Sequence, residues 1–232
     1  MSPALDHFYT HPIFGAGITV IAFAIGLQTQ RRWSWAQPVV ITTLLIIGTL
    51  LLLRIPYASY KIGGDLISTF LAPATVALAV PFYHHAKRIR HQLRPILIAC
   101  TLGAIFGILS AGLVAHLAQL PREVILALLP KSATAPISME VARHIGGKPE
   151  LAALASVLSG LLGSIIGLPL LRRLHINADI PTGTAIGTSS HGLGTARLLR
   201  ESEYLGSISA LAMALTGIIT ALFTPLLKHW PG

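Results

Sequence analysis

Residues 151–171 read LAALASVLSGLLGSIIGLPLL, a run without a charged side chain. Its length of about 20 residues is what an α-helix needs to cross roughly 30 Å of hydrocarbon. Comparable apolar runs cover residues 12–28, 38–53, 95–117 and 204–227. Only 11% of the 232 residues are charged, whereas soluble domains carry about 25%. The sequence therefore predicts an all-α integral membrane protein, a polytopic helical bundle in a lipid bilayer.

The formal net charge of +9 is concentrated between the apolar runs and at their ends. Because no soluble domain is available to carry a basic face, nucleic-acid binding is not expected. Lysine and arginine mark the cytoplasmic loops of membrane proteins. The stretch His84–Arg94, HHAKRIRHQLR, is therefore predicted to be a cytoplasmic loop. Counting three crossings back places the N-terminus outside, and it places Arg31 and Arg32 inside.

The third apolar segment, DLISTFLAPATVALAVPFYHH over residues 65–85, carries Pro73 in its middle. Proline inside a helix removes a backbone hydrogen bond and clashes with the preceding turn. We expect this segment to be bent or broken near Pro73. The preceding residues 57–65, YASYKIGGD, are predicted to form a loop in which Gly63 and Gly64 interrupt regular structure.

The fifth segment, residues 121–150, is split by Pro130 and Pro136. Strict alternation of crossings would place Arg172 and Arg173 outside, against the charge rule. The conflict disappears if the fifth segment enters the membrane and returns without crossing it, which requires protein or a wet cavity around its non-helical backbone. The prediction is a bundle of about seven to eight membrane segments, broken or re-entrant near Pro73 and over Pro130–Pro136.

The chain is expected to form a single integral membrane domain over residues 1–232. A faint internal repeat pairs LAPATVALAVP, beginning at Leu71, with LLPKSATAPIS, beginning at Leu128. Paired proline-interrupted segments in two halves of a transporter point to a binding site. The matches are few, so two alternatives stay open: chance similarity, or two weakly similar halves at about 38–118 and 121–228.

Lys131 lies between the two prolines of the fifth segment, beside Ser132 and Thr134. A charged residue in a membrane segment costs at least a few kcal/mol at the bilayer centre, so it usually faces a cavity or a partner. One hypothesis is that Lys131 and the nearby hydroxyls hold an anion, helped by the free N–H groups of a half-helix that begins near Ile137. The alternative is that Lys131 extends to water from an interfacial position.

Residues 187–199, GTSSHGLGTARLL, are unusually polar for this chain. The glycines allow the helix to unwind, the hydroxyls supply donors and acceptors, and an arginine can bind both oxygens of a carboxylate. Alternatively, small and hydroxyl side chains serve helix packing and the arginine is an interfacial anchor. We favour a substrate path, with Gly192 and Gly194 as helix breaks and these candidate ligands: Ser189, Ser190, His191, Thr195 and Arg197.

Several kinds of chemistry are not expected. GTSSHG is not the G-x-S-x-G nucleophile elbow of hydrolases, and the ten histidines are scattered without metal-ligand spacing. We therefore predict no catalytic residue, no metal and no cofactor. The pairs Gly103/Gly107 and Gly163/Gly167 have the small-xxx-small spacing that predicts close helix packing.

Three stretches together resemble one family. FLAPATVALAVPFY, LLPKSATAPISMEVARHIGGKPELAA and IGTSSHGLGTARLL are similar in order and spacing to the LrgB/CidB family of bacterial inner-membrane proteins. That family is related to the membrane domain of the plant plastidal glycolate/glycerate translocator. The resemblance covers roughly Pro38 to Leu227. The chain departs from the usual motifs at Ala133, Ala135 and Ser189, and Ala135 replaces a hydroxyl that could affect which substrate fits.

The resemblance implies a multi-pass inner-membrane protein with a periplasmic N-terminus, and it carries two functions. One is transport of small monocarboxylates such as glycolate, glycerate or pyruvate. The other is antiholin-like regulation of murein hydrolases and cell lysis with an LrgA/CidA-type partner. The buried lysine and broken helices favour a carrier that works by alternating access, and a homo-oligomer is expected separately. In it, Lys131 and Arg197 would supply charge, the hydroxyls would bind substrate, and His191 could take up a proton near neutral pH.

Overall fold

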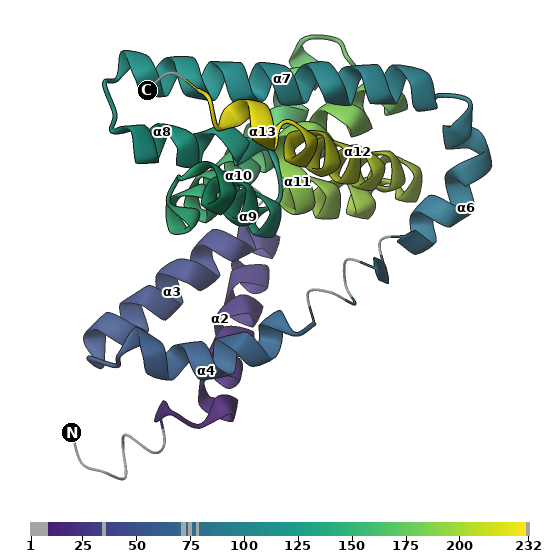
Figure 1. The fold of residues 1–232 in the computed structure, drawn as a ribbon. Helices are drawn as coiled ribbons and strands as arrows, with labels where there is room; N and C mark the ends of the chain where they lie inside the picture. Colours follow the sequence, from purple (N-terminus) through teal and green to yellow (C-terminus); the bar gives the residue numbers. More distant parts are fainter. Residues whose placement is uncertain (1–8, 34–35, 71–72, 74–75, 78, 231–232) are drawn as a thin grey trace. The chain divides into compact units, whose positions relative to one another are not determined.

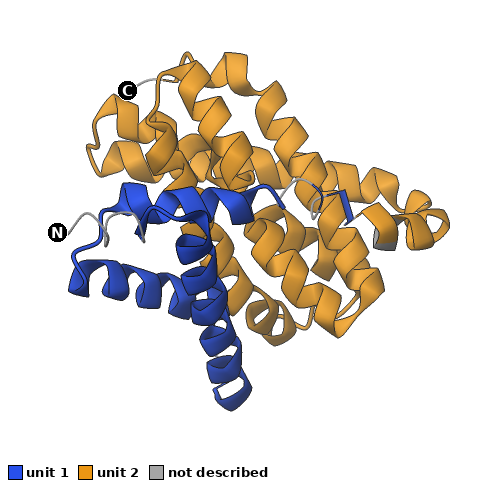
Figure 2. Ribbon diagram, turned by 90° about the horizontal axis from the view of Figure 1, so that it is seen from below, with its two compact units in different colours: residues 1–77 blue, residues 78–232 orange. Residues whose placement is uncertain are grey.

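The structure is a computed structural model, and it describes residues 9–33, 36–70, 73, 76–77 and 79–230 (Figure 1). These residues form helices joined by short turns, with no strand among them. The all-α prediction is confirmed. The chain divides into two compact units, residues 1–77 and 78–232 (Figure 2). The single domain and the internal repeat expected from the sequence stay predictions.

The first unit contains α2 (Pro12–Arg32), α3 (Pro38–Leu52) and α4 (Tyr57–Ser68). The predicted loop over residues 57–65 was wrong, because these residues belong to α4. Gly63 does not break the helix there. A Cβ added to it would lie 2.6 Å from the Cα of Gly15 on α2, so glycine at this position lets the two helices touch through their backbones.

Long apolar helices form the frame of the second unit: α7 (Leu93–Leu117), α10 (Pro149–Arg173) and α12 (Glu203–Leu222), the last followed by α13 (Thr224–Leu227). Four described helices are long and apolar enough to cross a membrane: α2, α7, α10 and α12. Helix α3 is a shorter apolar helix. The chain is thus a helical membrane protein. A count of seven to eight segments is not confirmed, because the other elements are short, broken or polar.

The fifth segment forms a hairpin, which we call hairpin 1, from α8 (Arg122–Leu128), the 3-10 helix η1 (Leu129–Ser132) and α9 (Ala135–Ile145). The backbone is extended at Ala133, between the two arms. The arms run back along each other, since Leu129 of η1 packs with Val141 of α9. Past the end of α9, a Cβ added to Gly147 would lie 2.7 Å from the nitrogen of Ala127. Hairpin 1 therefore enters from the end of α7 and returns to the start of α10 at that same end.

The polar seventh segment, α11 (Asp179–Glu201), is also a hairpin, which we call hairpin 2. Its backbone is non-helical at His191, where φ is 47° and ψ is −133°. A straight helix would hold residues eight apart about 12 Å from each other. Here a Cβ added to Gly194 would lie 2.6 Å from Cγ2 of Ile186, and Leu198 packs in the same cluster as Ile186. The chain thus reverses at His191 and returns to the end where it entered.

The two hairpins enter the frame from opposite ends and meet at its middle. Along α7, hairpin 2 meets Gly103 and hairpin 1 meets Gly107. Along α10 the order reverses, because hairpin 1 meets Ser156 and hairpin 2 meets Gly163. The helices α7 and α10, 25 residues each, therefore run antiparallel, each followed in the chain by its own hairpin. The two helix-and-hairpin pairs are thus inverted relative to each other, a pairing that differs from the repeat predicted from the sequence.

The basic stretch His84–Arg94 is not a loop, which corrects the prediction. Helix α6 (Ala79–Arg90) continues through most of it, and α7 begins three residues later (Figure 1). Packing on α12 stabilises helix α6, because the Ile89 side chain of α6 is fully buried in this contact. The expected break near Pro73 stays a prediction, because the neighbouring residues 71–72 and 74–75 lie outside the described part of the chain.

Candidate functional site

A cavity of about 620 Å³ lies in the second unit, between α7 and hairpin 2 and closed by the tip of hairpin 1. It begins between Pro95 and Pro181, both exposed near the starts of α7 and α11. Its lining continues to Lys131 and Ser132 at the tip of hairpin 1 and to Ser110, about one turn of α7 beyond Gly107. Its polar lining consists of hydroxyls and one ammonium group: Ser110, Lys131, Ser132, Ser159, Thr184, Thr188 and Ser189.

Glycines on α7 bring both hairpins to the cavity wall. A Cβ added to Gly103 would lie 2.7 Å from Cγ2 of Thr188, and one added to Gly107 would lie 2.5 Å from Oγ of Ser132. On α10, a Cβ added to Gly163 would lie 3.1 Å from the Cβ of Ser190. The close packing predicted from the small-xxx-small pairs is confirmed, and each long helix uses a central glycine to hold a serine from its own hairpin.

Lys131 is the one charged residue among the lining side chains, and it is half-buried. It takes part in no ion pair with another described residue, and no carboxylate lines the cavity. Its ammonium therefore lacks a counter-ion within the described part of the protein. A buried cation in this condition attracts an anionic ligand.

The backbone at the tip of hairpin 1 is held by two serines that sequence analysis did not single out. Ser138 Oγ donates to the carbonyl oxygens of Pro130 and Ala133 at 2.6 and 3.1 Å. Ser156 Oγ on α10 donates to the carbonyl of Ala133 as well. Because these carbonyls have donors, the non-helical turn that carries Lys131 is stable inside protein.

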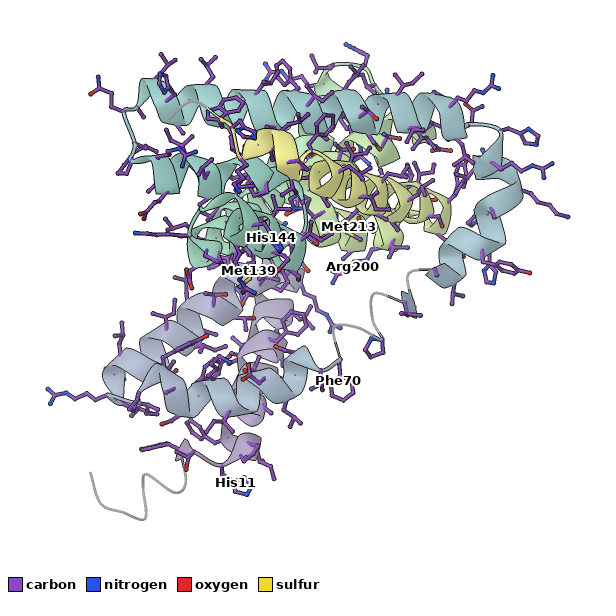
Figure 3. The ribbon with its side chains drawn as sticks, viewed as in Figure 1. His11, Phe70, Met139, His144, Arg200 and Met213 are labelled. Carbon is purple, nitrogen blue, oxygen red and sulfur yellow. The ribbon has the colours of Figure 1, made fainter. Side chains whose placement is uncertain are left out.

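Thr134 and Pro136 lie on the returning arm of hairpin 1. Thr134 precedes the first residue of α9 and makes no side-chain cap hydrogen bond, and Pro136 occupies the first turn, where its missing N–H costs nothing. Thr134 is not among the residues that line the cavity. Farther along α9, Glu140 forms exposed ion pairs with Arg143 and with His144. His144 is labelled in Figure 3.

The tip of hairpin 2 places only Ser189 in the cavity. Ser190 is fully buried against α10, with its hydroxyl 3.1 Å from that of Ser189. His191 is 5% exposed, its Nδ1 lies next to Gly160 of α10, and its imidazole is near the backbone of Ser132 in hairpin 1. Its Nε2 is buried and has no hydrogen-bond partner among the described residues. The two hairpin tips thus meet at His191.

The returning arm of hairpin 2 holds the remaining predicted ligands away from the cavity. Thr195 Oγ1 donates to the carbonyl of His191 at 2.7 Å and lies 2.8 Å from Oγ of Ser209. Gly192 has open space around it, and Gly194 lies against Ser190. The reversal of the chain falls at His191, one residue before Gly192.

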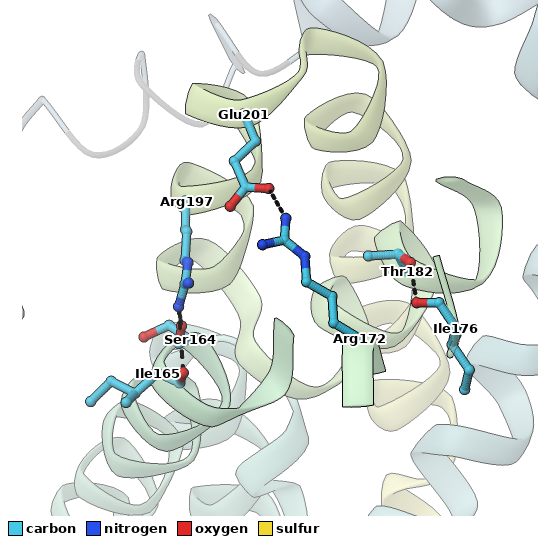
Figure 4. A network of polar contacts seen from close by, with 7 residues as sticks. All are labelled: Ser164, Ile165, Arg172, Ile176, Thr182, Arg197 and Glu201. Carbon is cyan, nitrogen blue, oxygen red and sulfur yellow. Dashed lines mark hydrogen bonds and ion pairs between the residues drawn. The ribbon is translucent and has the colours of Figure 1, made fainter. Parts of the chain in front are cut away.

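Arg197 contacts the middle of α10 instead of the cavity (Figure 4). Its Nη1 donates to the carbonyl oxygens of Ser164 and Ile165, the second at 3.4 Å. Pro169 explains why the second acceptor is available, because it has no N–H with which to bind the Ile165 carbonyl four residues earlier. Nearby, Arg172 pairs with Glu201 at 2.8 Å and fixes the end of hairpin 2 to α10.

Thr184 is a lining residue that sequence analysis missed. It is 4% exposed, and its Oγ1 is buried without a partner among the described residues. Thr188, one turn later, is already engaged, with its Oγ1 3.6 Å from Cys100 Sγ and 3.3 Å from the Thr216 hydroxyl. The spacing of the two threonines by four residues, on one helical face, was the available signal.

Comparison with known proteins identifies the family of this chain. Residues 19–230 match the LrgB-like family. The chain belongs to this family. It is 34% identical over 212 residues to YwbG of Bacillus subtilis, an uncharacterized protein, covering 90% of the chain and 94% of YwbG. An uncharacterized Haemophilus influenzae protein is 35% identical over 210 residues, covering 90% and 91% of the two chains. No solved structure matches this LrgB-like protein significantly.

Proposed function

We propose that this protein carries small monocarboxylates, such as glycolate, glycerate or pyruvate, across the bacterial inner membrane. The observation that supports this best is the meeting of two opposed hairpins beside a cavity whose only charged lining residue is Lys131. Broken segments of this kind, meeting near the middle of a membrane protein, are typical of the substrate sites of secondary transporters.

The charge of the cavity favours a monoanion. Lys131 can neutralise one carboxylate, while the other polar lining groups are neutral hydroxyls. A dicarboxylate would bring a second negative charge into a site without a cation for it, and burying an unpaired charge is costly. We therefore expect succinate to be a poor substrate.

The inverted arrangement of α7 with hairpin 1 and α10 with hairpin 2 supports alternating access. The cavity runs from the end where α7 and α11 begin as far as the hairpin tips. The basic residues of α6 lie at that end, and on the positive-inside rule we propose that it is cytoplasmic. The periplasmic N-terminus stays a prediction. In the opposite state, a passage along α10 would reach the same tips, with Lys131, Ser132, Ser159 and Ser189 accessible from the other side.

The test of transport uses purified protein in liposomes, with uptake of radiolabelled glycolate, glycerate and pyruvate measured with and without a pH gradient. Saturable uptake that is greater than that of succinate is expected. A pH-gradient dependence would indicate proton coupling. Absence of uptake by folded protein would contradict the carrier proposal and favour the lysis regulator that needs an LrgA/CidA-type partner. Homo-oligomerisation stays a prediction that this assay does not address.

One-sided access can be tested with a single cysteine. Cys100 is the only cysteine and is buried, so Cys100→Ala gives a cysteine-free background. In it, Ala99→Cys would place a thiol in the cavity wall on the side of α6. A membrane-impermeant thiol reagent is expected to label it from the cytoplasmic side only, and saturating glycolate is expected to slow labelling. Equal labelling from both sides would contradict one-sided access.

The substitution Thr184→Val tests whether the Thr184 hydroxyl, which has no hydrogen-bond partner among the described residues, binds the substrate. Valine keeps the shape but cannot hydrogen-bond, so a ligand that uses Thr184 Oγ1 should bind about 3- to 10-fold more weakly, the effect of one lost hydrogen bond. We expect KM for glycolate to rise by that factor while KM for acetate, which lacks the hydroxyl, changes little. Thr101→Val is the matched control, because its hydroxyl bonds only the Leu97 carbonyl of its own helix. An equal rise in both KM values would contradict recognition of the substrate hydroxyl.

A further inference from the structure

Helix α6 has an inner face that is fixed to the rest of the second unit. Ile89 is fully buried in the cluster with Tyr204. The guanidinium of Arg88 lies 3.8 Å above the centre of the Tyr204 ring and 3.8 Å from an Asp179 carboxylate oxygen. On the same side, His84 lies 3.2 Å from a Glu203 carboxylate oxygen. Two acidic residues next to α6, Asp179 and Glu203, are thus engaged by its inner face.

The outer face of α6 carries Tyr83, Lys87 and Arg90, spaced i, i+4 and i+7 so that they form one stripe. All three are exposed, Tyr83 by 80%. Neither Lys87 nor Arg90 forms an ion pair with another described residue, and the exposed Arg94 follows in the first turn of α7. Among the described residues the stripe is therefore a cationic surface without counter-ions, with an aromatic side chain beside it.

The neighbouring helices place this stripe at the bilayer surface. Helix α7, which is long and apolar enough to cross a membrane, begins at Leu93, three residues after α6 ends. Helix α12, which also qualifies, begins at Glu203, where α6 packs. The hydrocarbon region must begin close to these two starts. The level of α6 is then that of the lipid headgroups, where tyrosine and basic residues are both enriched.

We propose that the outer face of α6 binds the headgroups of anionic phospholipids. The charge is complementary, because a phosphodiester that carries a net negative charge provides the counter-ions that Lys87, Arg90 and Arg94 lack. Tyrosine can lie with its ring at the acyl boundary and its hydroxyl in the headgroup layer. The inner contacts hold the helix in place, so the cationic stripe is preformed. This surface is separate from the cavity, and the proposal does not depend on transport.

The test is native mass spectrometry of the full-length protein in detergent, titrated with phosphatidylglycerol or with phosphatidylcholine of the same acyl chains. Each basic residue near an anionic surface contributes roughly a fivefold gain in affinity. The double variant Lys87→Gln/Arg90→Gln is therefore expected to bind phosphatidylglycerol at least tenfold more weakly. Its binding of phosphatidylcholine should stay within twofold of that of the unchanged protein.

The matched control is Arg143→Gln/Lys148→Gln, which removes the same charge from exposed residues that already pair with Glu140 and Glu123. It should retain phosphatidylglycerol binding. An equal loss in both double variants would show a general charge effect and overturn the proposal, as would unchanged binding in the α6 variant. Millimolar inorganic phosphate should not displace bound phosphatidylglycerol. If it displaced the lipid as effectively as added phosphatidylglycerol does, the stripe would be a site for free anions, and the proposal would also be overturned.

Discussion

Lys131→Met is expected to reduce kcat/KM for glycolate uptake by about 100-fold in liposomes. Methionine has nearly the same length but carries no charge, so the substrate carboxylate would enter a cavity that has lost its only cation. A hydrogen bond to a charged group is worth about 1.5–3 kcal/mol, and 2.7 kcal/mol corresponds to roughly a hundredfold change. Initial uptake rates across a range of glycolate concentrations would measure the effect.

The structure also predicts what this substitution should leave unchanged. Lys131 has no ion-pair partner among the described residues, so its removal leaves no opposite charge buried alone. Thermal stability in detergent should therefore be retained or increased. Lys131→Arg keeps the charge and should retain part of the uptake. Lys148→Met, at an exposed lysine paired with Glu123, should transport normally. Uptake that survives Lys131→Met would remove Lys131 from the substrate site.

The apolar frame could be predicted from the sequence because it depends on composition alone. The run at residues 151–171 lies within α10, and the run at 95–117 lies within α7. Proline spacing likewise located the interruption that carries Lys131. These signals are local, since hydrocarbon thickness and a missing N–H act on each segment by itself.

The hairpins and the loop prediction show where local signals fail. The reversal at His191 depends on contacts with distant residues, such as Gly163 on α10, and no local pattern marks a histidine with a positive φ. At Gly63 the glycine suggested a break, yet it serves a close crossing with α2 that is visible only in three dimensions. A glycine in a sequence is equally compatible with close packing of two helices and with a flexible backbone. The residues that pack against it decide which of the two occurs.

Arg197→Met is expected to destabilise the protein by about 1–3 kcal/mol, because it leaves the Ile165 carbonyl without the donor that Pro169 cannot provide. Pro169→Ala would restore the N–H that bonds this carbonyl within α10. In that background, Arg197→Met should cost less, with a coupling of at least about 1 kcal/mol between the two sites. Unfolding by a denaturing detergent, measured for the four proteins of the cycle, would give this coupling.

The same cycle separates two roles for Arg197 that sequence alone cannot distinguish. If the arginine mainly fixes hairpin 2 to α10, Arg197→Met should lower stability, and Pro169→Ala should restore both stability and uptake. If it binds the substrate carboxylate, as the sequence predicted, Arg197→Met should abolish uptake at unchanged stability, and Pro169→Ala should rescue neither. The contacts with Ser164 and Ile165, and the absence of Arg197 from the cavity lining, favour the first outcome. Lys131 would then be the sole cation of the described residues on the substrate path.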